Sequence, residues 1–201
     1  MRRGGAAPGG EDAADARRER IRRYVLTGAP GAGKTTIARR LRERGHAVID
    51  EAATDVIAYG QSRGDEEPWN GPKFLEEVVR MQRRRQQAPP ASGTAVQFYD
   101  RSPLCTLALA RYLRHPVPAA LDAEIDRIRR ENVYESRVFL IHPIGFIVPT
   151  AARRISFEES LAFARVHEEV YRAHGYDLVD VPPGTVEERL ALIEERVRTP
   201  S

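Results

Sequence analysis

The sequence has little cysteine and no long apolar run, and each of these absences excludes a class of protein. Cys105 is the single cysteine among 201 residues, so no disulfide can form within the chain. We interpret Cys105 as a small core residue and expect a reducing, cytoplasmic location. No run approaches the roughly 18 apolar residues of a membrane-spanning helix, and Arg2-Arg3 is followed by Gly and Ala rather than by an apolar signal region. We expect no membrane span.

An excess of one charge is also lacking. The 32 Lys and Arg residues against 29 Asp and Glu residues leave a net charge of only +3. This balance weakly favours anionic ligands and does not by itself indicate nucleic acid. The basic run Arg83-Arg84-Arg85 falls within an amphipathic helical pattern, so we interpret it as a solvated helix face. We expect no nucleic-acid partner.

The rest of the sequence predicts one α/β domain behind a tail. Residues 1–20 are rich in Gly and mixed charge and predict a flexible N-terminal tail, whereas residues 21–201 have the size of a single domain. Strands are predicted at residues 24–27, 47–50, 95–99, 137–141 and 178–181, and helices at 35–44, 51–59, 74–87, 103–113, 119–132, 156–174 and 186–197. A long polar loop is predicted at residues 60–71. The alternation predicts a parallel sheet with helices on both faces.

The segment from Gly28 to Thr35 satisfies the pattern G-x-x-x-x-G-K-[ST] at every fixed position, between a predicted strand and a predicted helix. Glycines let backbone N–H groups turn toward phosphates, Lys34 reaches the β- and γ-phosphates, and the Thr35 hydroxyl binds Mg²⁺. The pattern therefore predicts a Walker A loop for ATP or GTP with Mg²⁺. The expected nucleotide-binding residues are Gly28, Ala29, Pro30, Gly31, Ala32, Gly33, Lys34, Thr35 and Thr36.

Acidic residues stand where two predicted strands end. In open α/β sheets ligands bind beyond the carboxyl ends of the strands. Asp100 is expected to organise Mg²⁺ there, in the manner of a Walker B carboxylate, and Glu51 to take a proton from an acceptor or position a water. The alternatives are a helix N-cap or loop salt bridge for Asp100 and a first-turn helix acid for Glu51.

Three arginines are candidates to neutralise charge on a transferred phosphoryl group. Arg101 follows Asp100 directly, and Arg153-Arg154 lies between a Pro- and Gly-containing stretch and a predicted helix. Such a position suits a small closing lid near residues 143–160. A surface arginine is the alternative for each.

Several of these motifs together resemble a known family. They are the loop GAPGAGKTT, the strand end Asp50-Glu51-Ala52-Ala53, the strand end Asp100-Arg101-Ser102 and the segment from Tyr171 to Arg189. They look like the small P-loop ATPases that carry the AAA label, a family related to the ribosylnicotinamide-kinase half of NadR-type proteins. More distantly, the chain is similar to thymidylate and deoxynucleoside kinases.

The resemblance implies a kinase-type three-layer P-loop fold with strand order 2-3-1-4-5, a lid and phosphoryl transfer from ATP. It implies that Lys34 and Thr35 bind phosphate and Mg²⁺, that Asp100 and Arg101 serve the metal and the phosphates, and that Arg153 or Arg154 acts from the lid, with Glu51 as the base. The chain is too short for the ring-forming AAA+ module with its separate helical domain, so a hexameric unfoldase is not expected.

Two functions stay open at this point. The first is a kinase that transfers the γ-phosphoryl group of ATP to a hydroxyl of a nucleoside-like or other small metabolite. The alternative is a Mg²⁺-dependent ATPase or GTPase switch that acts on a protein or lipid partner. The sequence leaves the acceptor open and is compatible with a homodimer.

Overall fold

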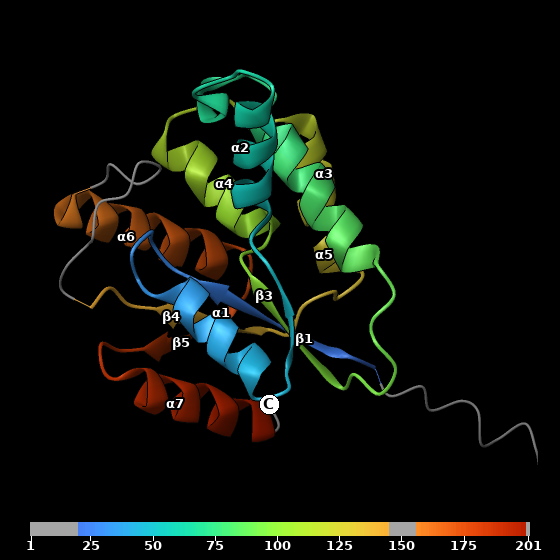
Figure 1. The fold of residues 1–201 in the computed structure, drawn as a ribbon, viewed down its shortest axis with the longest axis vertical. Coiled ribbons are helices and arrows are strands. Elements are labelled where there is room, and N and C mark those ends of the chain that lie inside the picture. The colour runs from blue at the N-terminus through green and yellow to red at the C-terminus, as the bar shows by residue number, and fades with distance from the viewer. Residues whose placement is uncertain (1–19, 145–155, 200–201) are drawn as a thin grey trace, which may run out of the picture.

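The structure, a computed structural model, describes residues 20–144 and 156–199 (Figure 1). The strands are β1 (Arg22–Thr27), β2 (Ala47–Ile49), β3 (Val96–Asp100), β4 (Arg137–Ile141) and β5 (Asp177–Val181). The helices are α1 (Lys34–Glu43), α2 (Ala52–Ser62), the short 3₁₀ helix η1 (Pro68–Asn70), α3 (Phe74–Gln87), α4 (Pro103–Tyr112), α5 (Ala119–Arg130), α6 (Phe157–Ala173) and α7 (Val186–Arg198).

The strands form one parallel sheet with β1 at its centre. The order is β2-β3-β1-β4-β5, and every neighbouring pair is parallel. The register places Leu26 beside Asp100 on one side of β1 and Thr27 beside Leu140 on the other. Both the fold class and the strand order predicted from the sequence are confirmed. The carboxyl ends of β1, β3 and β4 consequently meet at one edge of the sheet.

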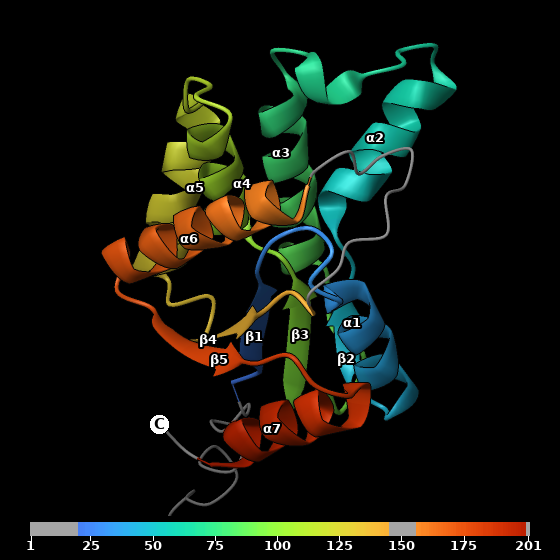
Figure 2. The same ribbon diagram turned by 90° about the vertical axis from the view of Figure 1, so that its left-hand side faces the viewer.

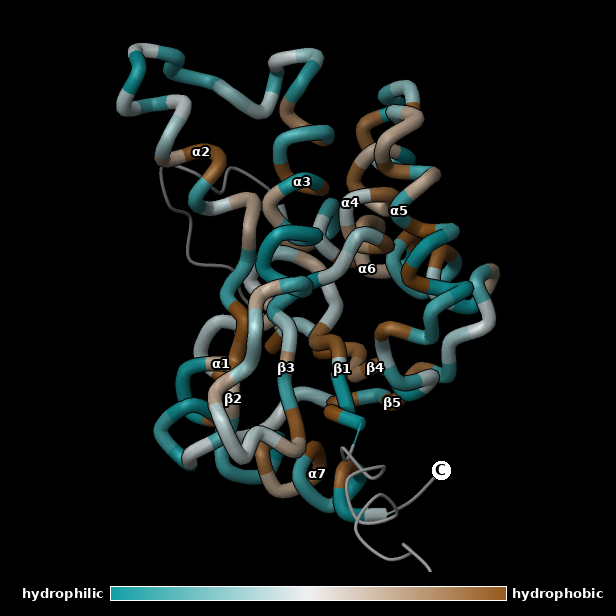
Figure 3. The backbone as a smooth tube through the Cα atoms, turned by 90° about the vertical axis from the view of Figure 1, so that its right-hand side faces the viewer, coloured by the Kyte–Doolittle hydropathy of each residue, from teal (hydrophilic) through white to brown (hydrophobic). Residues whose placement is uncertain are grey.

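Helices cover both faces of the sheet, because alternate residues of each strand face opposite ways. Tyr24 and Leu26 belong to a core shared with α1 and α7, whereas Val25 belongs to a core shared with α4, α5 and α6. Figure 2 shows these layers from the side, and in Figure 3 hydrophobic colour gathers along the central strands. A third cluster joins α2, α3 and η1, with Trp69 packed against it.

The second helix is longer than predicted. We expected it to end at Tyr59 and a loop to begin at Gly60, but α2 continues to Ser62. Gly60 does not break the helix because the Pro68 ring packs against it: a Cβ at Gly60 would lie 2.5 Å from the Pro68 Cγ. The glycine here makes room for a neighbouring segment.

The end caps of the last two helices are built from local sequence. Ser156 and Glu159 form a reciprocal capping box at the start of α6, and Thr185 and Glu188 form another at the start of α7. Among the described residues, no helix combines the length and the apolar composition needed to cross a membrane.

Parts of three predictions lie outside the described residues. These are the predicted tail up to residue 19, residues 145–155 of the predicted lid, and with them Arg153 and Arg154. Their assignments stay predictions.

The packing of β3 gives a stability prediction. The Phe98 side chain is 0% exposed and its ring centroid lies 6.0 Å from that of Tyr24, whereas Tyr59 on α2 is 63% exposed. We expect Phe98→Ala to lower the free energy of unfolding by about 3–5 kcal/mol, because it removes buried contacts and leaves a cavity. Tyr59→Ala is the matched control and should change it by about 0.5 kcal/mol or less. Urea denaturation measures both; equal losses would contradict this assignment of the core.

Candidate active site

Glycine residues allow the backbone conformation of the loop between β1 and α1. Gly28 has φ 127°, Gly31 has φ 82° and Gly33 has φ 87°, values that side chains strongly disfavour. At Gly28 a second constraint applies, because a Cβ there would lie 2.4 Å from the Ile141 carbonyl oxygen. The loop thus runs against the end of β4 and arches beneath α6 before it enters α1 (Figure 2).

Four carbonyl oxygens of this loop are held by side chains from four different elements. The Arg101 guanidinium donates to the Gly28 carbonyl (3.3 Å) and the Lys34 ammonium to the Ala29 carbonyl (2.7 Å). The Ser160 hydroxyl of α6 donates to the Pro30 carbonyl (3.1 Å), and the Arg189 guanidinium of α7 to the Ala32 carbonyl (3.0 Å). The Ala32 N–H donates to the Ala29 carbonyl (3.4 Å). Because the loop carbonyls are engaged by the protein, the other N–H groups of the loop are left for an anion.

Lys34 lies at the first position of α1 and is buried, with 5% of its surface exposed. Burial, helped by the Arg101 cation, lowers its pKa from 10.5 to about 7, although the Asp100 and Glu51 carboxylates oppose the shift. A phosphate group placed against this ammonium would favour its charged form. Gly33 precedes it as the N-cap of α1, so the positive end of that helix points into the same space.

Glu51 and Arg101 form an ion pair at the carboxyl edge of the sheet, with 20% and 14% of their side chains exposed. The sequence named both residues but did not predict that they would meet. Burial opposes the ionisation of Glu51, yet the Arg101 and Lys34 cations outweigh it and lower its pKa. Arg101 has φ 78°, and its backbone N–H donates to the Leu26 carbonyl (3.1 Å). A strained backbone held by such contacts is typical of functional sites.

Asp100 ends β3 with 5% of its surface exposed, and its Oδ1 has no hydrogen-bond partner among the described residues. Burial raises the pKa of Asp100; the Glu51 carboxylate raises it further, whereas the Lys34 cation lowers it. A helix N-cap was the alternative role for Asp100, but the N-cap of α4 is Ser102, whose hydroxyl accepts from the Leu104 N–H. A buried carboxylate oxygen without a donor is well suited to a cation or to water that a cation binds.

The residues fit Mg²⁺ only as part of a nucleotide complex. The Thr35 side chain is exposed at the start of α1, and Thr36 beside it is half-buried. Within residues 20–144 and 156–199, no group of three or more His, Cys, Asp or Glu residues could hold a metal alone. Phosphate oxygens would have to complete the coordination. Thr35 and Asp100 are thus the residues that would serve the metal.

Polar groups that the sequence did not identify lie behind the loop. The Thr27 hydroxyl contacts the His167 Nδ1 (3.1 Å) and the Cys105 sulfur (3.3 Å), and the Tyr171 hydroxyl contacts Cys105 and Ser102. His167 is 0% exposed, and burial lowers its pKa well below the usual value. Cys105 is buried in the core, as expected. This network fixes the last residue of β1 before the loop begins.

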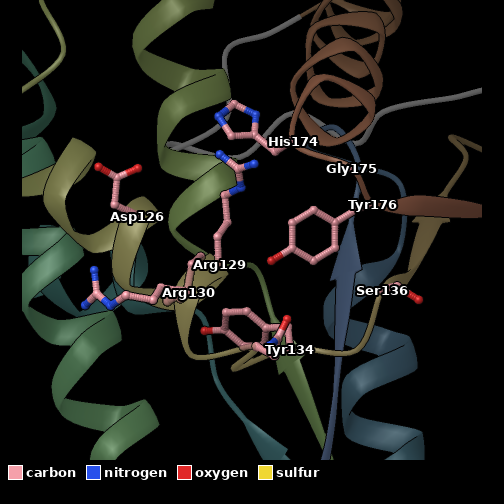
Figure 4. A pocket seen from close by; sticks show the side chains of 10 residues that line it. Asp126, Arg129, Arg130, Tyr134, Ser136, His174, Gly175 and Tyr176 are labelled. Carbon is pink, nitrogen blue, oxygen red and sulfur yellow. The ribbon is translucent and has the colours of Figure 1, made fainter.

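Two pockets lie in different places. A pocket of about 540 Å³ opens at the amino ends of β4 and β5, the edge opposite the phosphate loop. Figure 4 shows Arg129, His174 and Tyr176 on its walls; these three belong to none of the groups described above. A narrow second pocket borders Arg101 of the ion pair instead, and Gln82, Arg85, Tyr99 and Asp100 are among its other lining residues.

Residues 23–189 match a protein family described as "AAA domain". The chain belongs to this AAA domain family. A comparison with curated protein sequences found no match. The match spans β1 through Arg189 and therefore contains the whole phosphate loop, both acidic strand ends and all four groups that hold the loop carbonyls.

Among solved structures similar to this AAA domain chain, two are named as kinases and a third is a NadR protein. A thymidylate kinase from Ehrlichia chaffeensis has a TM-score of 0.61 at 14% identity, covering 89% of this chain and 99% of that one. A deoxyadenosine kinase from M. mycoides has a TM-score of 0.57 at 18% identity, and the match covers 87% of this chain and 97% of that one. A NadR protein in complex with NR has 0.62 at 18%, covering 87% of this chain and 50% of that one. At these identities the likeness establishes the fold.

The pKa of Lys34 gives a prediction for the pH dependence of nucleotide binding. Because phosphate favours the charged ammonium, binding should take up a proton when the pH lies above the value of about 7 in the free protein. Affinity for ATP should therefore fall as pH rises, by up to about tenfold per unit. Calorimetry at about pH 8, roughly one unit above that pKa, in buffers of different ionisation enthalpy measures the uptake. The Lys34→Arg variant should bind ATP without taking up a proton. A wild-type protein that takes up no proton would contradict the assignment of the uptake to Lys34.

Gly28 gives a second prediction, with a control elsewhere in the chain. Gly64 also has positive φ, 88°, but no atom lies within 4 Å of a Cβ placed there. Gly64→Ala should cost about 1–2 kcal/mol through its backbone alone. Gly28→Ala should cost roughly 2 kcal/mol more and weaken ATP binding, since the Ile141 carbonyl must move. Thermal unfolding and ATP titration of both variants measure this; equal destabilisation would show that the close approach to β4 is unimportant.

Proposed function

We propose that the protein is a kinase that uses Mg²⁺ and ATP to phosphorylate a hydroxyl group of a small molecule. The observation that carries the proposal is the ionised Glu51, held beside a buried Arg101 and next to the phosphate loop. A carboxylate in this place can accept a proton from an incoming hydroxyl, and the adjacent cations stabilise charge on the phosphoryl group. A binding protein that only held nucleotide would not need this base.

In the proposed reaction, the loop N–H groups and Lys34 hold the β- and γ-phosphates. Mg²⁺, served by Thr35 and Asp100, would neutralise phosphate charge when bound. The acceptor oxygen forms a bond to the γ-phosphorus while the bond from that phosphorus to the β,γ-bridging oxygen breaks, and ADP leaves. The hydroxyl proton passes to the Glu51 carboxylate. Arg101 keeps Glu51 ionised and contributes positive charge beside the loop, and Arg153 or Arg154 would add charge from the lid.

The acceptor is proposed to enter on the side of α2 and α3. The narrow pocket there touches Asp100 and Arg101 and continues to Gln82 and Arg85 of α3. Arg85 donates to the Asp50 carbonyl (2.8 Å) and pairs with Asp55 of α2. These contacts fix α3 against the start of α2, so polar side chains line the approach to Glu51. This pocket has a volume of only about 10 Å³, so a nucleoside-like acceptor would bind at its mouth and use the polar side chains there.

The relatives of known fold support the same reaction class. The names of two of them, thymidylate kinase and deoxyadenosine kinase, state a phosphotransferase activity, and another NadR structure was solved with NAD and AMP-PNP. ATP is accordingly the proposed phosphoryl donor. The rival hypothesis, a switch that hydrolyses nucleotide for a protein or lipid partner, predicts no phosphorylated small molecule.

An acceptor screen tests the proposal. Wild-type protein, Lys34→Ala, Glu51→Gln and the exposed control Glu77→Gln are incubated with Mg²⁺-ATP and a panel of nucleosides, sugars and aminoglycosides, and products are identified by mass spectrometry. We expect one acceptor class to gain a single phosphoryl group with wild type and Glu77→Gln. Glu51→Gln should lower kcat by about 10²–10⁴ while ATP still binds, and Lys34→Ala should abolish transfer.

Either of two results would overturn the proposal. The first is slow release of free phosphate with no phosphorylated product from any panel member, stimulated instead by a protein or lipid; this would establish the switch. The second is a Glu51→Gln variant with unchanged kcat, which would remove Glu51 from the reaction.

A further inference from the structure

Arg189 of α7 carries a buried positive charge with no counterion among residues 20–144 and 156–199. Only 5% of its surface is exposed. Its Nη1 donates to the Ala32 carbonyl (3.0 Å), its Nη2 donates to the His142 carbonyl (2.8 Å), and its Nε has no partner among the described residues. No carboxylate of the described residues lies within ion-pair distance. The guanidinium therefore joins the phosphate loop to the end of β4, while no carboxylate of the described part of the chain compensates its charge.

The nearby acidic side chains are engaged elsewhere. Glu188 closes the capping box with Thr185, and Glu187 pairs with Arg44. His142, whose carbonyl accepts from Arg189, turns its ring to Asp180 (2.7 Å). Residues 145–155, which follow β4 in the chain, include no Asp or Glu.

Its position adds to the cost of this charge. Arg189 lies in the first turn of α7, where the positive end of the helix disfavours a cation. A Cβ at Gly33 would lie 3.2 Å from Arg189 Nη1, so the guanidinium packs directly against the N-cap residue of α1. Two helix N-termini and a buried guanidinium thus concentrate positive potential at one point of the loop. Buried charges are ordinarily paired, and departures from that rule are expected where a ligand completes the pairing.

The other cations of the site differ in this respect. Arg101 is paired with Glu51, and the Asp100 carboxylate acts on Lys34. Ser160, which holds the Pro30 carbonyl in the same way as Arg189 holds that of Ala32, is neutral. Replacing a neutral donor with a small apolar side chain loses a hydrogen bond alone, whereas replacing Arg189 also loses charge. This contrast separates the two effects.

We propose that Arg189 is a positioning residue that holds the Ala32 carbonyl away from the nucleotide, and that its uncompensated charge makes binding favour the nucleotide with more negative charge. The inference rests on the proposed nucleotide site but not on phosphoryl transfer. The Arg189 charge attracts every added phosphate group across a low-dielectric loop, so it increases the affinity for ATP more than the affinity for ADP. The two contacts fix the loop for either nucleotide.

The test compares equilibrium binding of Mg²⁺-ATP, Mg²⁺-ADP and adenosine, measured by calorimetry, in four variants. Arg189→Met should weaken ATP binding roughly tenfold and ADP binding roughly threefold, so the ratio of the two affinities falls. Arg189→Lys, which keeps the charge and cannot bridge both carbonyls, should keep the ratio and weaken both nucleotides. Ser160→Ala should weaken both nucleotides by the same factor. Arg198→Met, the same change at an exposed position of α7, should alter nothing.

An Arg189→Met protein that is folded by circular dichroism and keeps the wild-type affinity ratio would overturn the proposal. If that variant does not fold, Arg189→Gln keeps a donor for one carbonyl without the charge, and the same ratio decides. Because only binding is measured, a protein that phosphorylates no acceptor can still pass this test. If the protein phosphorylates an acceptor but its ratio of ATP to ADP affinities does not change in the Arg189 variants, only the proposed role of Arg189 is refuted.

Discussion

The backbone of the phosphate loop imposes the constraint on which the site depends. For its N–H groups to face an anion, its carbonyl groups must find donors on the other side. Here the donors come from the end of β3, from α1, from α6 and from α7. These elements are separated by up to 157 positions in the chain. The loop is therefore a local motif whose conformation depends on the whole fold.

The charges around the loop follow from the same arrangement. Lys34, Glu51, Asp100 and Arg101 act on one another's charges, but burial outweighs these interactions at Lys34, whose pKa it lowers, and at Asp100, whose pKa it raises. Arg189 adds a charge that this group does not balance, and the helix ends at Gly33 and Thr185 increase the same potential. A polyphosphate supplies the missing negative charge. The free site is thus electrostatically incomplete, which is how a protein retains affinity for a strongly hydrated ligand.

Sequence reasoning succeeded where the structural signal is local. The positions of the strands, of the glycine loop and of the acidic strand ends follow from spacing within short segments, whereas the strand order followed from the resemblance that these segments carry. It did not find that Glu51 pairs with Arg101, because the two are 50 positions apart and each has its own local explanation. Ser160 gave no signal, and Arg189 entered only as the last residue of a segment that carries the resemblance, because each looks like an ordinary residue in the first turns of a helix. Gly60 misled us because its partner Pro68 lies beyond the helix.

The distribution of rigid contacts also indicates where specificity is encoded. On the α6 and α7 side, Thr27 is held by His167 and Cys105, and the loop is fixed by Ser160 and Arg189, so little freedom remains for distinguishing ligands beyond their phosphates. On the opposite side, α2 and η1 rest on a separate small cluster and meet α3 through side chains such as Arg85. That region can vary without disturbing the phosphate loop. In the proposed kinase, acceptor choice would therefore belong to α2 and α3.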